Sequence, residues 1–365
     1  MKATLEISAL ADAARHVLRA ADPHQPTVTF DASDGAVVLT AYDGIAHSTA
    51  RVDARVDEPA SFALNGAWLA ALAEATRPGE AEVTERDGSL GVRGGDGRLV
   101  MRVSPEGSRP PTPAMPDAWT DVDADAFAAL VKSVAPMATV RGKLPILDMV
   151  RLTCADGMLS AQATDRYKMS ARRMEASGMP EGEWLVGGAW LSGVKRADRI
   201  GVTPSMFYVA QGPYTDGTAL YDGRYPDTGR LWWDARRMPD ASVELDRAEL
   251  EDAVKALSRL AFDAKPDSTI ALRLTGASGD LLRVAFDRRG MDGSDGTGGY
   301  RVVAADVRGD VDVRADARLL SALLKAWDCE RIRLLFHRRD RPVLVRREDE
   351  PYAGLLFVPL SSQAA

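Results

Sequence analysis

The sequence predicts an α+β protein built from three tandem copies of one unit, in which two helices pack on antiparallel sheets. A strand-to-helix segment recurs at a spacing of about 120 residues. An amphipathic helix precedes each copy of that segment, and strand–turn–strand patterns follow it. The 365 residues are enough for several domains of ordinary size. We therefore expect three domains, covering residues 1–118, 119–239 and 240–365.

The recurring segment is recognised by its glycine, tryptophan and leucine. Residues 66–69 are Gly-Ala-Trp-Leu, and residues 188–191 repeat the same four residues. A looser third copy runs from Val311–Asp316 into residues 317–324. Because each copy changes from a strand-like to a helical spacing of apolar residues, each predicts a short strand that leads into an amphipathic helix.

A further helix is predicted before each of these segments. Apolar residues three and four positions apart share one face of a helix. Residues of the type that caps helix N-termini precede the three runs, at Ser8, Asp123 and Asp246. The apolar positions of the runs are Leu10, Ala14 and Val17, then Phe127, Val131 and Val134, then Leu250, Val254 and Leu257.

Strands and linkers fill the rest of each unit. Prolines within residues 109–116 exclude a helix or a central strand, and Met238-Pro239-Asp240 marks a second boundary. Alternating segments joined by glycine-rich or charged turns predict antiparallel hairpins. These segments are residues 82–85, 90–93 and 98–103 in the first unit, and residues 331–337, 342–346 and 355–360 in the third.

Composition excludes several classes of protein. Hydrophobic residues make up 45% and charged residues 27%, a balance typical of globular chains. No apolar run reaches the length of about 18 residues that a membrane span needs, and the N-terminus lacks the apolar core of a signal peptide, so a cytoplasmic protein is expected. Cys154 and Cys329 are expected to be buried thiols. The four histidines form no ligand pair, so no metal site and no cofactor are expected.

Positive charge recurs at fixed places although the net charge is −7. In each unit, a basic residue falls on the exposed face of the first helix, opposite the apolar face. Such a surface would contact phosphates without reading bases, whereas the alternative is an ordinary solvated helix face mixed with acidic residues. The repetition favours a DNA-facing surface, formed by Arg15, Arg19, Arg77, Lys132, Lys195, Arg196, Arg199, Lys255, Arg259, Arg318 and Lys325.

Five short motifs carry a resemblance to a known family. Residues 144–147 are Leu-Pro-Ile-Leu, and residues 163–169 are Ala-Thr-Asp-Arg-Tyr-Lys-Met. Residues 222–227 are Asp-Gly-Arg-Tyr-Pro-Asp, residues 39–43 are Leu-Thr-Ala-Tyr-Asp, and residues 358–360 are Val-Pro-Leu. Together these motifs resemble those of the bacterial sliding clamp family, the beta subunit of DNA polymerase III, and the resemblance covers essentially the whole chain.

The resemblance implies a non-enzymatic function. It implies a head-to-tail homodimer that closes into a ring around double-stranded DNA, which it would contact without sequence specificity. It also implies a processivity factor that tethers the replicative DNA polymerase and the clamp loader through linear peptide motifs. No nucleotide-binding motif occurs in this sequence, so opening the ring would require a separate ATP-driven protein.

The resemblance further implies a peptide cleft between the second and third domains. Mostly apolar groups at strand ends and in loops suit the anchoring of a leucine- or phenylalanine-bearing peptide. The alternative is that the aliphatic residues among them belong to the core between domains. The cleft residues carried over by position are Leu147, Thr164, Arg166, Tyr167, Lys168, Met169, Pro226, Leu231, Leu356, Val358, Pro359 and Leu360.

The dimer contact implied by the resemblance pairs an edge strand of the first domain with one of the third. Its expected apolar residues are Leu99, Met101, Leu260 and Phe262. The sequence also departs from the family pattern. Gln25 and Ala189 stand where many members have a basic residue, which leaves the individual DNA contacts open.

Two rival functions remain to be compared with a clamp. An enzyme could use Asp43 and Asp165 as a carboxylate pair, but each follows a predicted strand and is expected to cap a turn. The segment 290–299 resembles a calcium or phosphate loop, yet it lacks the later glutamate of the first and the lysine of the second, so a hairpin connection is expected. The other rival is a DNA-independent ring or scaffold that binds linear peptide motifs.

Overall fold

The computed structural model forms two compact units. Unit 1 comprises Met1–Ala124, Ser177–Met179 and Arg196–Leu220, and unit 2 comprises Asp125–Ala176, Pro180–Lys195 and Tyr221–Ala365. The predicted second domain, residues 119–239, is therefore divided between the two units, and the three-domain boundaries stay a prediction. The structure describes residues 1–94, 97–103, 111–229, 238–261, 269–287, 298–337, 341–347 and 354–360.

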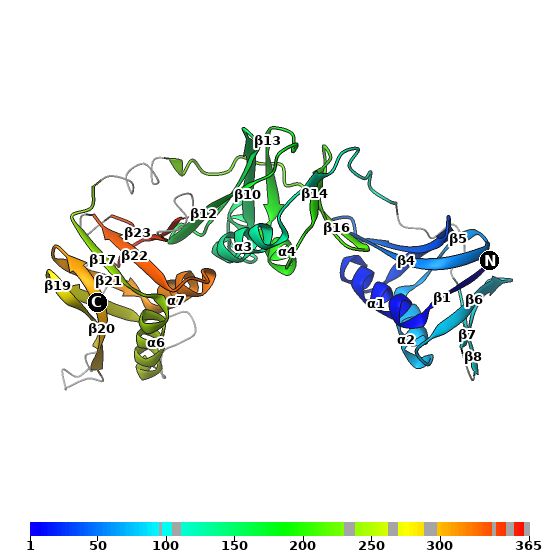
Figure 1. Ribbon diagram of the computed structural model, residues 1–365, viewed down its shortest axis with the longest axis horizontal. Coiled ribbons are helices and arrows are strands. Elements are labelled where there is room, and N and C mark those ends of the chain that lie inside the picture. Colours follow the sequence, from blue (N-terminus) through cyan, green and yellow to red (C-terminus); the bar gives the residue numbers. More distant parts are fainter. Residues whose placement is uncertain are drawn as a thin grey trace. The chain divides into compact units, whose positions relative to one another are not determined.

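Unit 1 is built on antiparallel strands that pair in the order β8-β7-β6-β1-β4-β16-β15-β14-β9, with β2, β3 and β5 joined to this path through β4 (Figure 1). Strands β1, β2 and most of β3 alternate buried and more exposed residues, because one face of the sheet covers the core. Their bounds are β1 Lys2–Glu6, β2 Thr27–Ser33, β3 Ala36–Tyr42, β4 Ala46–Glu58, β5 Ala60–Asn65, β6 Glu80–Arg86, β7 Ser89–Gly94, β8 Gly97–Arg102, β9 Thr120–Asp121, β14 Arg199–Val202, β15 Met206–Gln211 and β16 Tyr214–Ala219.

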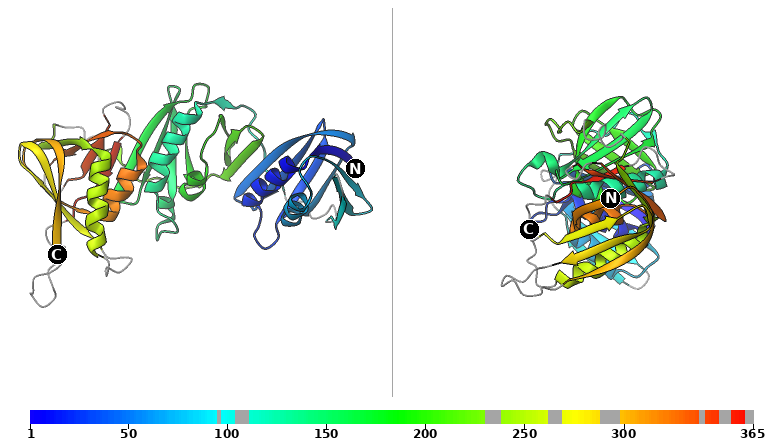
Figure 2. Two further views of the ribbon diagram at one scale, coloured as in Figure 1. Left: turned by 60° about the horizontal axis from the view of Figure 1, so that its bottom comes forward. Right: turned by 90° about the vertical axis from the view of Figure 1, so that its left-hand side faces the viewer.

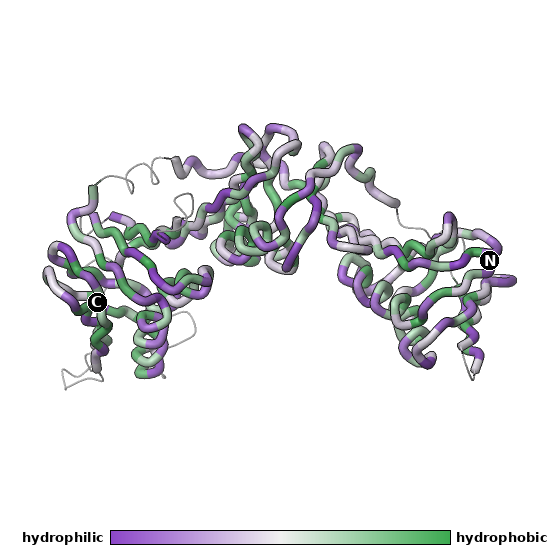
Figure 3. Tube along the Cα trace, viewed as in Figure 1, coloured by the Kyte–Doolittle hydropathy of each residue, from purple (hydrophilic) through white to green (hydrophobic). Residues whose placement is uncertain are grey.

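Two helices cover the first part of this sheet. Helix α1 spans Ile7–Val17 and continues into the short 3-10 turn η1, Leu18–Ala20, and helix α2 spans Gly66–Ala75. A single hydrophobic core joins the apolar faces of both helices to the strands. Figure 3 shows hydrophobic and hydrophilic residues interspersed along the chain.

Unit 2 contains a second antiparallel path, in the order β13-β10-β11-β12-β24-β23-β22-β17-β20-β19-β18-β21. Among the described residues, β13 and β21 form its two edges. The bounds are β10 Met149–Ala155, β11 Met158–Thr164, β12 Lys168–Glu175, β13 Gly182–Gly187, β17 Ala241–Asp246, β18 Ala271–Gly276, β19 Gly279–Asp287, β20 Gly298–Arg308, β21 Val311–Asp316, β22 Arg331–Phe336, β23 Val343–Arg346 and β24 Gly354–Phe357.

Helices of unit 2 repeat the strand-to-helix arrangement of unit 1. Strand β13 leads directly into α4, and β21 leads directly into α7, as β5 leads into α2. The bounds are α3 Ala124–Val134, α4 Gly188–Gly193, α6 Arg247–Ser258 and α7 Ala317–Ala326, with 3-10 turns η3 Ala135–Met137, η4 Pro145–Asp148 and η5 Arg259–Ala261. Both recurring segments and the looser third copy are thus confirmed as strands followed by helices.

The predicted helix faces are confirmed, but the predicted caps are confirmed only in part. All the apolar positions expected on α1, α3 and α6 are buried. The carboxylate of Asp246 caps α6 by accepting the N–H of Glu249 at 2.8 Å. Ser8 is not a cap, because α1 begins one residue earlier at Ile7 and the Ser8 hydroxyl donates to Glu6 instead.

Each unit contains a junction at which a late strand joins an earlier strand across a long stretch of sequence. In unit 1, β16 pairs with the first half of β4, from Tyr214 opposite Ala50 to Thr218 opposite Ala46. In unit 2, β24 pairs with the first half of β12, from Lys168 opposite Phe357 to Ala171 opposite Gly354. Sequence periodicity does not predict such pairings, and the first of them explains why part of the predicted second domain belongs to unit 1.

Polar groups reinforce the junction in unit 1. Asp216 on β16 accepts hydrogen bonds from the Ser48 hydroxyl at 2.6 Å and from Nε2 of His16 at 3.0 Å. Beside them, His47 is fully buried and its ring nitrogens have no hydrogen-bond partner among the described residues. Burial lowers the pKa of His47 to about 4, partly offset by the nearby carboxylate of Asp216.

Candidate functional site

A cavity of about 280 Å³ opens in unit 2 beside the end of β11 and the start of β12. Its walls come from segments far apart in the sequence: η4 and the residue before it, the β11–β12 turn, the segment that follows Tyr225, the residue before β23, and the residue after β24. The lining is largely apolar. The lining residues are Leu144, Ile146, Leu147, Thr164, Arg166, Tyr167, Lys168, Met169, Pro226, Asp227, Thr228, Pro342 and Val358.

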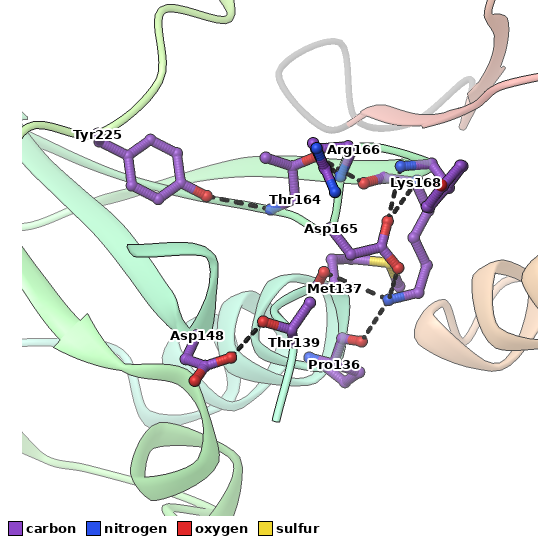
Figure 4. A network of polar contacts seen from close by, with 10 residues as sticks. Pro136, Met137, Thr139, Asp148, Thr164, Asp165, Arg166, Lys168 and Tyr225 are labelled. Carbon is purple, nitrogen blue, oxygen red and sulfur yellow. Dashed lines mark hydrogen bonds and ion pairs between the residues drawn. The ribbon is translucent and has the colours of Figure 1, made fainter. Parts of the chain in front are cut away.

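The carboxylate of Asp165 organises the turn between β11 and β12. Its Oδ1 atom accepts the backbone N–H groups of Tyr167 and Lys168, both at 2.8 Å. The Thr164 hydroxyl donates to the carbonyl of Lys168 at 2.8 Å and accepts the N–H of Arg166 at 3.0 Å (Figure 4). These bonds fix the backbone at the mouth of the cavity, so the side chains of residues 166–168 are held at its rim.

The same device holds the equivalent turn of unit 1. There Oδ1 of Asp43 accepts the N–H groups of Ile45 and Ala46 at 2.8 and 2.7 Å. The two aspartates are therefore turn caps, as the sequence predicts, and this geometry gives both carboxylates a structural role in place of catalysis.

Arg166 occupies a strained backbone position at the cavity. Its φ is +80°, in the left-handed region, whereas Gly44 takes the corresponding place in the turn of unit 1 with a φ of +96°. A side chain with a Cβ costs about 1–2 kcal/mol in this region. A long cationic side chain is thus kept at the rim where glycine would be easier to accommodate, and strain of this kind is frequent at ligand sites.

Lys168 connects the turn to the 3-10 segment η3. Its ammonium group lies 3.0 Å from Oδ2 of Asp165 and donates to the carbonyls of Pro136 and Met137 at 3.1 and 3.3 Å (Figure 4). The stem of Lys168 therefore lines the cavity while its charge is already satisfied. We infer that Lys168 shapes the wall and that Arg166, which is exposed, supplies the charge at the rim.

Tyr225 fixes the opposite wall. Its ring is buried at 5% exposure, and its hydroxyl oxygen accepts the backbone N–H of Thr164 at 3.1 Å. Burial raises the pKa of Tyr225 to about 12, so the hydroxyl is neutral at physiological pH. The residues that follow it, Pro226, Asp227 and Thr228, are among those that line the cavity.

Met169 forms the floor. It is buried and packs with Leu335 and Leu344, which belong to β22 and β23. The amide of Gln162 donates to its sulfur at 3.3 Å. The floor of the cavity is therefore the open margin of an apolar core. This agrees with both interpretations of these aliphatic residues that the sequence allows, a peptide cleft and a core between domains.

The structure brings most of the predicted cleft residues together. Eight of them line the cavity: Leu147, Thr164, Arg166, Tyr167, Lys168, Met169, Pro226 and Val358. Leu231 lies outside the described residues, and Leu356 is described only by its backbone, which pairs with Met169. Pro359 and Leu360 are not among the lining residues, and the Leu360 N–H donates to the carbonyl of Arg314 at 2.8 Å.

Sequence reasoning missed five lining residues. Leu144 and Ile146 lie inside the Leu-Pro-Ile-Leu motif, and Asp227 ends the Asp-Gly-Arg-Tyr-Pro-Asp motif, so extending the site to the whole motif would have found them. No sequence signal points to Thr228 or Pro342. They reach the cavity only because of how the chain folds.

The predicted DNA-facing residues are all exposed, but they differ in whether their charges contact other groups of the protein. In unit 1, Arg15 forms ion pairs with Asp12 and Glu74, and Arg19 contacts the ring of His16. In unit 2, Lys132 lies 3.4 Å from Asp328. Arg199 stacks its guanidinium 5.4 Å from the centre of the Trp119 ring, and Arg77, Arg196 and Arg318 make other contacts. Lys195, Lys255, Arg259 and Lys325 have no ion-pair partner among the described residues.

The predicted dimer residues fall into different environments. Leu99 on β8 is 37% exposed, and its neighbour Val100 is 56% exposed. Met101 lies on the same face of β8 but is 7% exposed and belongs to the core of unit 1. Leu260 is partly buried and lies close to Gly299 on β20, and Phe262 lies outside the described residues.

Within the described part of the chain, no group of three or more possible metal ligands is found. Cys154 is buried as expected, and Cys329 is only partly buried. None of the described helices is long and apolar enough to cross a membrane.

Comparison with known proteins gives a consistent family of relatives. No protein-family model matches the sequence. The chain is 24% identical over 291 residues to the beta sliding clamp of Micrococcus luteus, an alignment that covers 75% of this chain and 92% of that protein. It is 22% identical over 266 residues to the beta sliding clamp homolog GriR of Streptomyces muensis, covering 70% of this chain and 69% of that protein.

Solved structures share the fold over almost the full length. The DNA polymerase sliding clamp of Bacillus subtilis superposes with a TM-score of 0.87 at 17% identity, covering 99% of each chain. The DNA polymerase III subunit beta of Pseudomonas aeruginosa superposes with a TM-score of 0.85 at 18% identity, covering 99% of this chain and all of that one. Mixed helices and antiparallel sheets in this arrangement are therefore the fold of these proteins.

Proposed function

Because this chain belongs to the beta sliding clamp family, we propose that it encircles duplex DNA as a processivity factor. On the DNA it would tether the replicative polymerase and other DNA-processing proteins. A sliding clamp is a non-enzymatic protein of DNA replication. It acts by turning repeated rebinding of the polymerase into an intramolecular event at high effective concentration. The observation that carries the proposal is the coincidence of the cavity beside the β11–β12 turn with the predicted cleft residues, in a chain whose fold matches clamps from end to end.

Three tandem modules, with boundaries near residues 118 and 239, are part of this proposal. Their support is the recurrence of a strand followed by a helix, twice in each module. The pairs are β1–α1 and β5–α2, then β9–α3 and β13–α4, then β17–α6 and β21–α7.

The two junctions inside the chain suggest how a ring would close. Counting strands within each module, the eighth strand of one module pairs with the fourth strand of the module before it, as β16 does with β4 and β24 with β12. The remaining eighth strand is β8, and the remaining fourth strand is β20. A head-to-tail homodimer would pair β8 of one protomer with β20 of its partner.

The free edges of these two strands are compatible with that pairing. In the described part of the chain, β8 pairs only with β7, and residues 298–304 of β20 pair only with β19. Both strands expose apolar side chains: Leu99 and Val100 on β8, and Tyr300 and Val302 on β20. This pairing replaces Met101 with Val100 as the proposed apolar contact and keeps Leu99 and Leu260.

Duplex DNA is the proposed partner of the exposed basic residues. Lysine and arginine side chains that contact phosphates attract DNA without reading its sequence, and salt weakens this attraction. Because a closed ring prevents escape, weak contacts suffice. This is consistent with a chain of net charge −7 in which Arg15 is already paired with Asp12 and Glu74.

The cavity beside the β11–β12 turn is the proposed cleft for linear peptide motifs of the polymerase and the clamp loader. Its apolar floor at Met169 and its wall at Val358 would bury one large aliphatic or aromatic side chain. The exposed guanidinium of Arg166 at the rim favours an acidic residue beside that anchor.

Retention on circular and linear DNA tests the clamp. Loaded protein should stay on closed circular plasmid and be lost when the plasmid is cut, and native mass measurement should give a dimer. Equal loss from both DNA forms would instead favour a DNA-independent scaffold that binds peptides.

Titration of a polymerase-derived peptide tests the cleft separately. The double variant Met169→Ala and Val358→Ala should weaken peptide binding by about tenfold, since two buried contacts are removed. Leu281→Ala, an exposed aliphatic residue of β19 outside the predicted cleft, is the control and should bind as the parent does. Unchanged affinity of the double variant would contradict the cleft assignment.

A further inference from the structure

A second cavity in unit 2 lies between helices, apart from the proposed cleft. Its volume is about 520 Å³, and its walls are formed by α3, α7 and the end of α4 with the residues after it. Figures 1 and 2 show α7 lying beside α3 in different views. Small-molecule sites typically have volumes of about 300–1,000 Å³, so the space is sufficient for a compact ligand.

The walls of this cavity are apolar because small residues face it. Ala128 and Val131 contribute from α3, and Ala322 and Ala326 contribute from α7. These short side chains leave the space between the helices unfilled, where larger aliphatic residues would have closed it. An apolar cavity of this kind offers few partners for ordered water, so an apolar group is its natural occupant.

Three lysines converge on the rim from three different segments. Lys132 comes from α3, Lys195 follows α4, and Lys325 lies in the last turn of α7. Asp328 lies 3.4 Å from the Lys132 ammonium group, and both of these side chains are exposed to solvent. Neither Lys195 nor Lys325 has an ion-pair partner among the described residues. The rim therefore carries an excess of positive charge above an apolar interior.

We propose that this cavity binds a small anion with an apolar body, such as an aromatic or aliphatic carboxylate or sulfonate. The body would fill the space between α3 and α7, and the anionic group would stay at the rim between the lysines, where it relieves their mutual repulsion. A DNA phosphate could neutralise the lysines at the rim, but it has no apolar body with which to fill the interior. The site is separate from the proposed cleft and does not depend on the clamp function.

Fluorescence titration of the purified full-length protein with anilinonaphthalene sulfonate tests the site, because this probe is an apolar anion that becomes fluorescent when it is removed from water. We expect one saturable site per chain. Ala322→Trp and Ser192→Trp fill the cavity from different walls, and each should abolish saturable binding. Circular dichroism identifies a variant that does not fold, in which case the other one decides.

Charge reversal tests the rim. Lys195→Glu combined with Lys325→Glu should weaken the probe by at least about tenfold, whereas Lys255→Glu, on the exposed face of α6, should leave its affinity unchanged. Phenylnaphthylamine, a neutral relative of the probe, should bind the parent and the charge-reversed protein equally.

Two results would overturn the proposal. One is probe binding that survives both tryptophan substitutions. The other is probe binding that is lost in Val358→Trp, which fills the proposed cleft and leaves the second cavity open. Either result would assign the apolar anion to another surface.

Discussion

Tyr225→Phe isolates a single hydrogen bond that supports the cleft wall. The substitution keeps the buried ring and removes only the oxygen that accepts the Thr164 N–H at 3.1 Å. The variant therefore tests the hydroxyl alone. The buried N–H of Thr164 would then have no acceptor.

The expected effect follows from the burial of this bond. A buried donor that loses its partner costs about 1–3 kcal/mol, and no cavity large enough to add a packing penalty is created. We therefore expect the free energy of unfolding to fall by about 1–2 kcal/mol in urea titration. If about 1 kcal/mol of this loss comes from the segment that carries Pro226 and Thr228, the free energy of peptide binding becomes weaker by the same amount. The affinity for a cleft peptide then falls about fivefold.

The neighbouring substitution Tyr221→Phe provides the matched control. The Tyr221 side chain is partly exposed, at 39%, and its hydroxyl makes no hydrogen bond with the described residues. Its removal should change neither stability nor peptide affinity. If Tyr225→Phe is as stable as the parent protein and binds the peptide equally well, the hydroxyl does not anchor the wall and the reasoning is wrong.

Three other substitutions test features of the fold and the site. The pKa of His47 is lowered from 6.5 to about 4, so the unfolded chain takes up the proton at a higher pH than the folded protein does. The free energy of unfolding should therefore fall by up to about 3 kcal/mol as the pH drops from about 6.5 to 4. His47→Phe should flatten this pH dependence, whereas substitution of an exposed histidine, His24→Gln, should not. Arg166→Gly should relieve about 1 kcal/mol of backbone strain at φ +80°, partly offset by the greater freedom of glycine in the unfolded chain. The same variant should bind an acidic cleft peptide more weakly, and unchanged peptide affinity would show that Arg166 does not belong to the site. Asp246→Ala should lower the free energy of unfolding by about 1 kcal/mol because α6 loses its cap. Ser8→Ala should change the free energy of unfolding by less than half as much, because Ser8 does not cap α1. Equal effects of the two variants would contradict the capping geometry.

The regular elements were predictable because local spacing determines them. The faces of α1, α3 and α6 follow from apolar residues three and four positions apart. The repeated Gly-Ala-Trp-Leu segments mark the starts of α2 and α4 because glycine lets the helix approach its neighbours closely; a Cβ on Gly66 would lie 2.4 Å from the Val28 side chain, and one on Gly188 would lie 2.7 Å from Cβ of Ala138. The predicted cap at Ser8 is wrong because strand β1 passes directly into α1 without a side-chain cap.

The division into units could not be predicted from local spacing. It depends on which strands pair, and the partners of β16 and β24 lie far away in the sequence. Such pairings depend on free edges and complementary packing after the elements have formed, and no periodicity within β16 indicates that its partner is β4.

The candidate site was predictable where motifs mark it and not elsewhere. Thr164 to Met169 form one continuous turn and strand start, so a single motif locates five lining residues at once. Thr228 and Pro342 reach the cavity singly from other segments and carry no local signature. Charge was less predictable still, because the sequence marks Arg15 as basic and exposed but does not reveal its ion pairs with Asp12 and Glu74.

The eighth-to-fourth strand pairing also bears on how an assembled ring would come apart. Where β16 meets β4 and where β24 meets β12, both strands belong to one polypeptide, so a momentary rupture leaves the two edges near each other and they re-form quickly. No peptide linkage would hold β8 to β20 of another copy, and rejoining there would slow with dilution. A lasting gate would therefore form only at the two seams between protomers, and it would open without any loss of structure within either polypeptide.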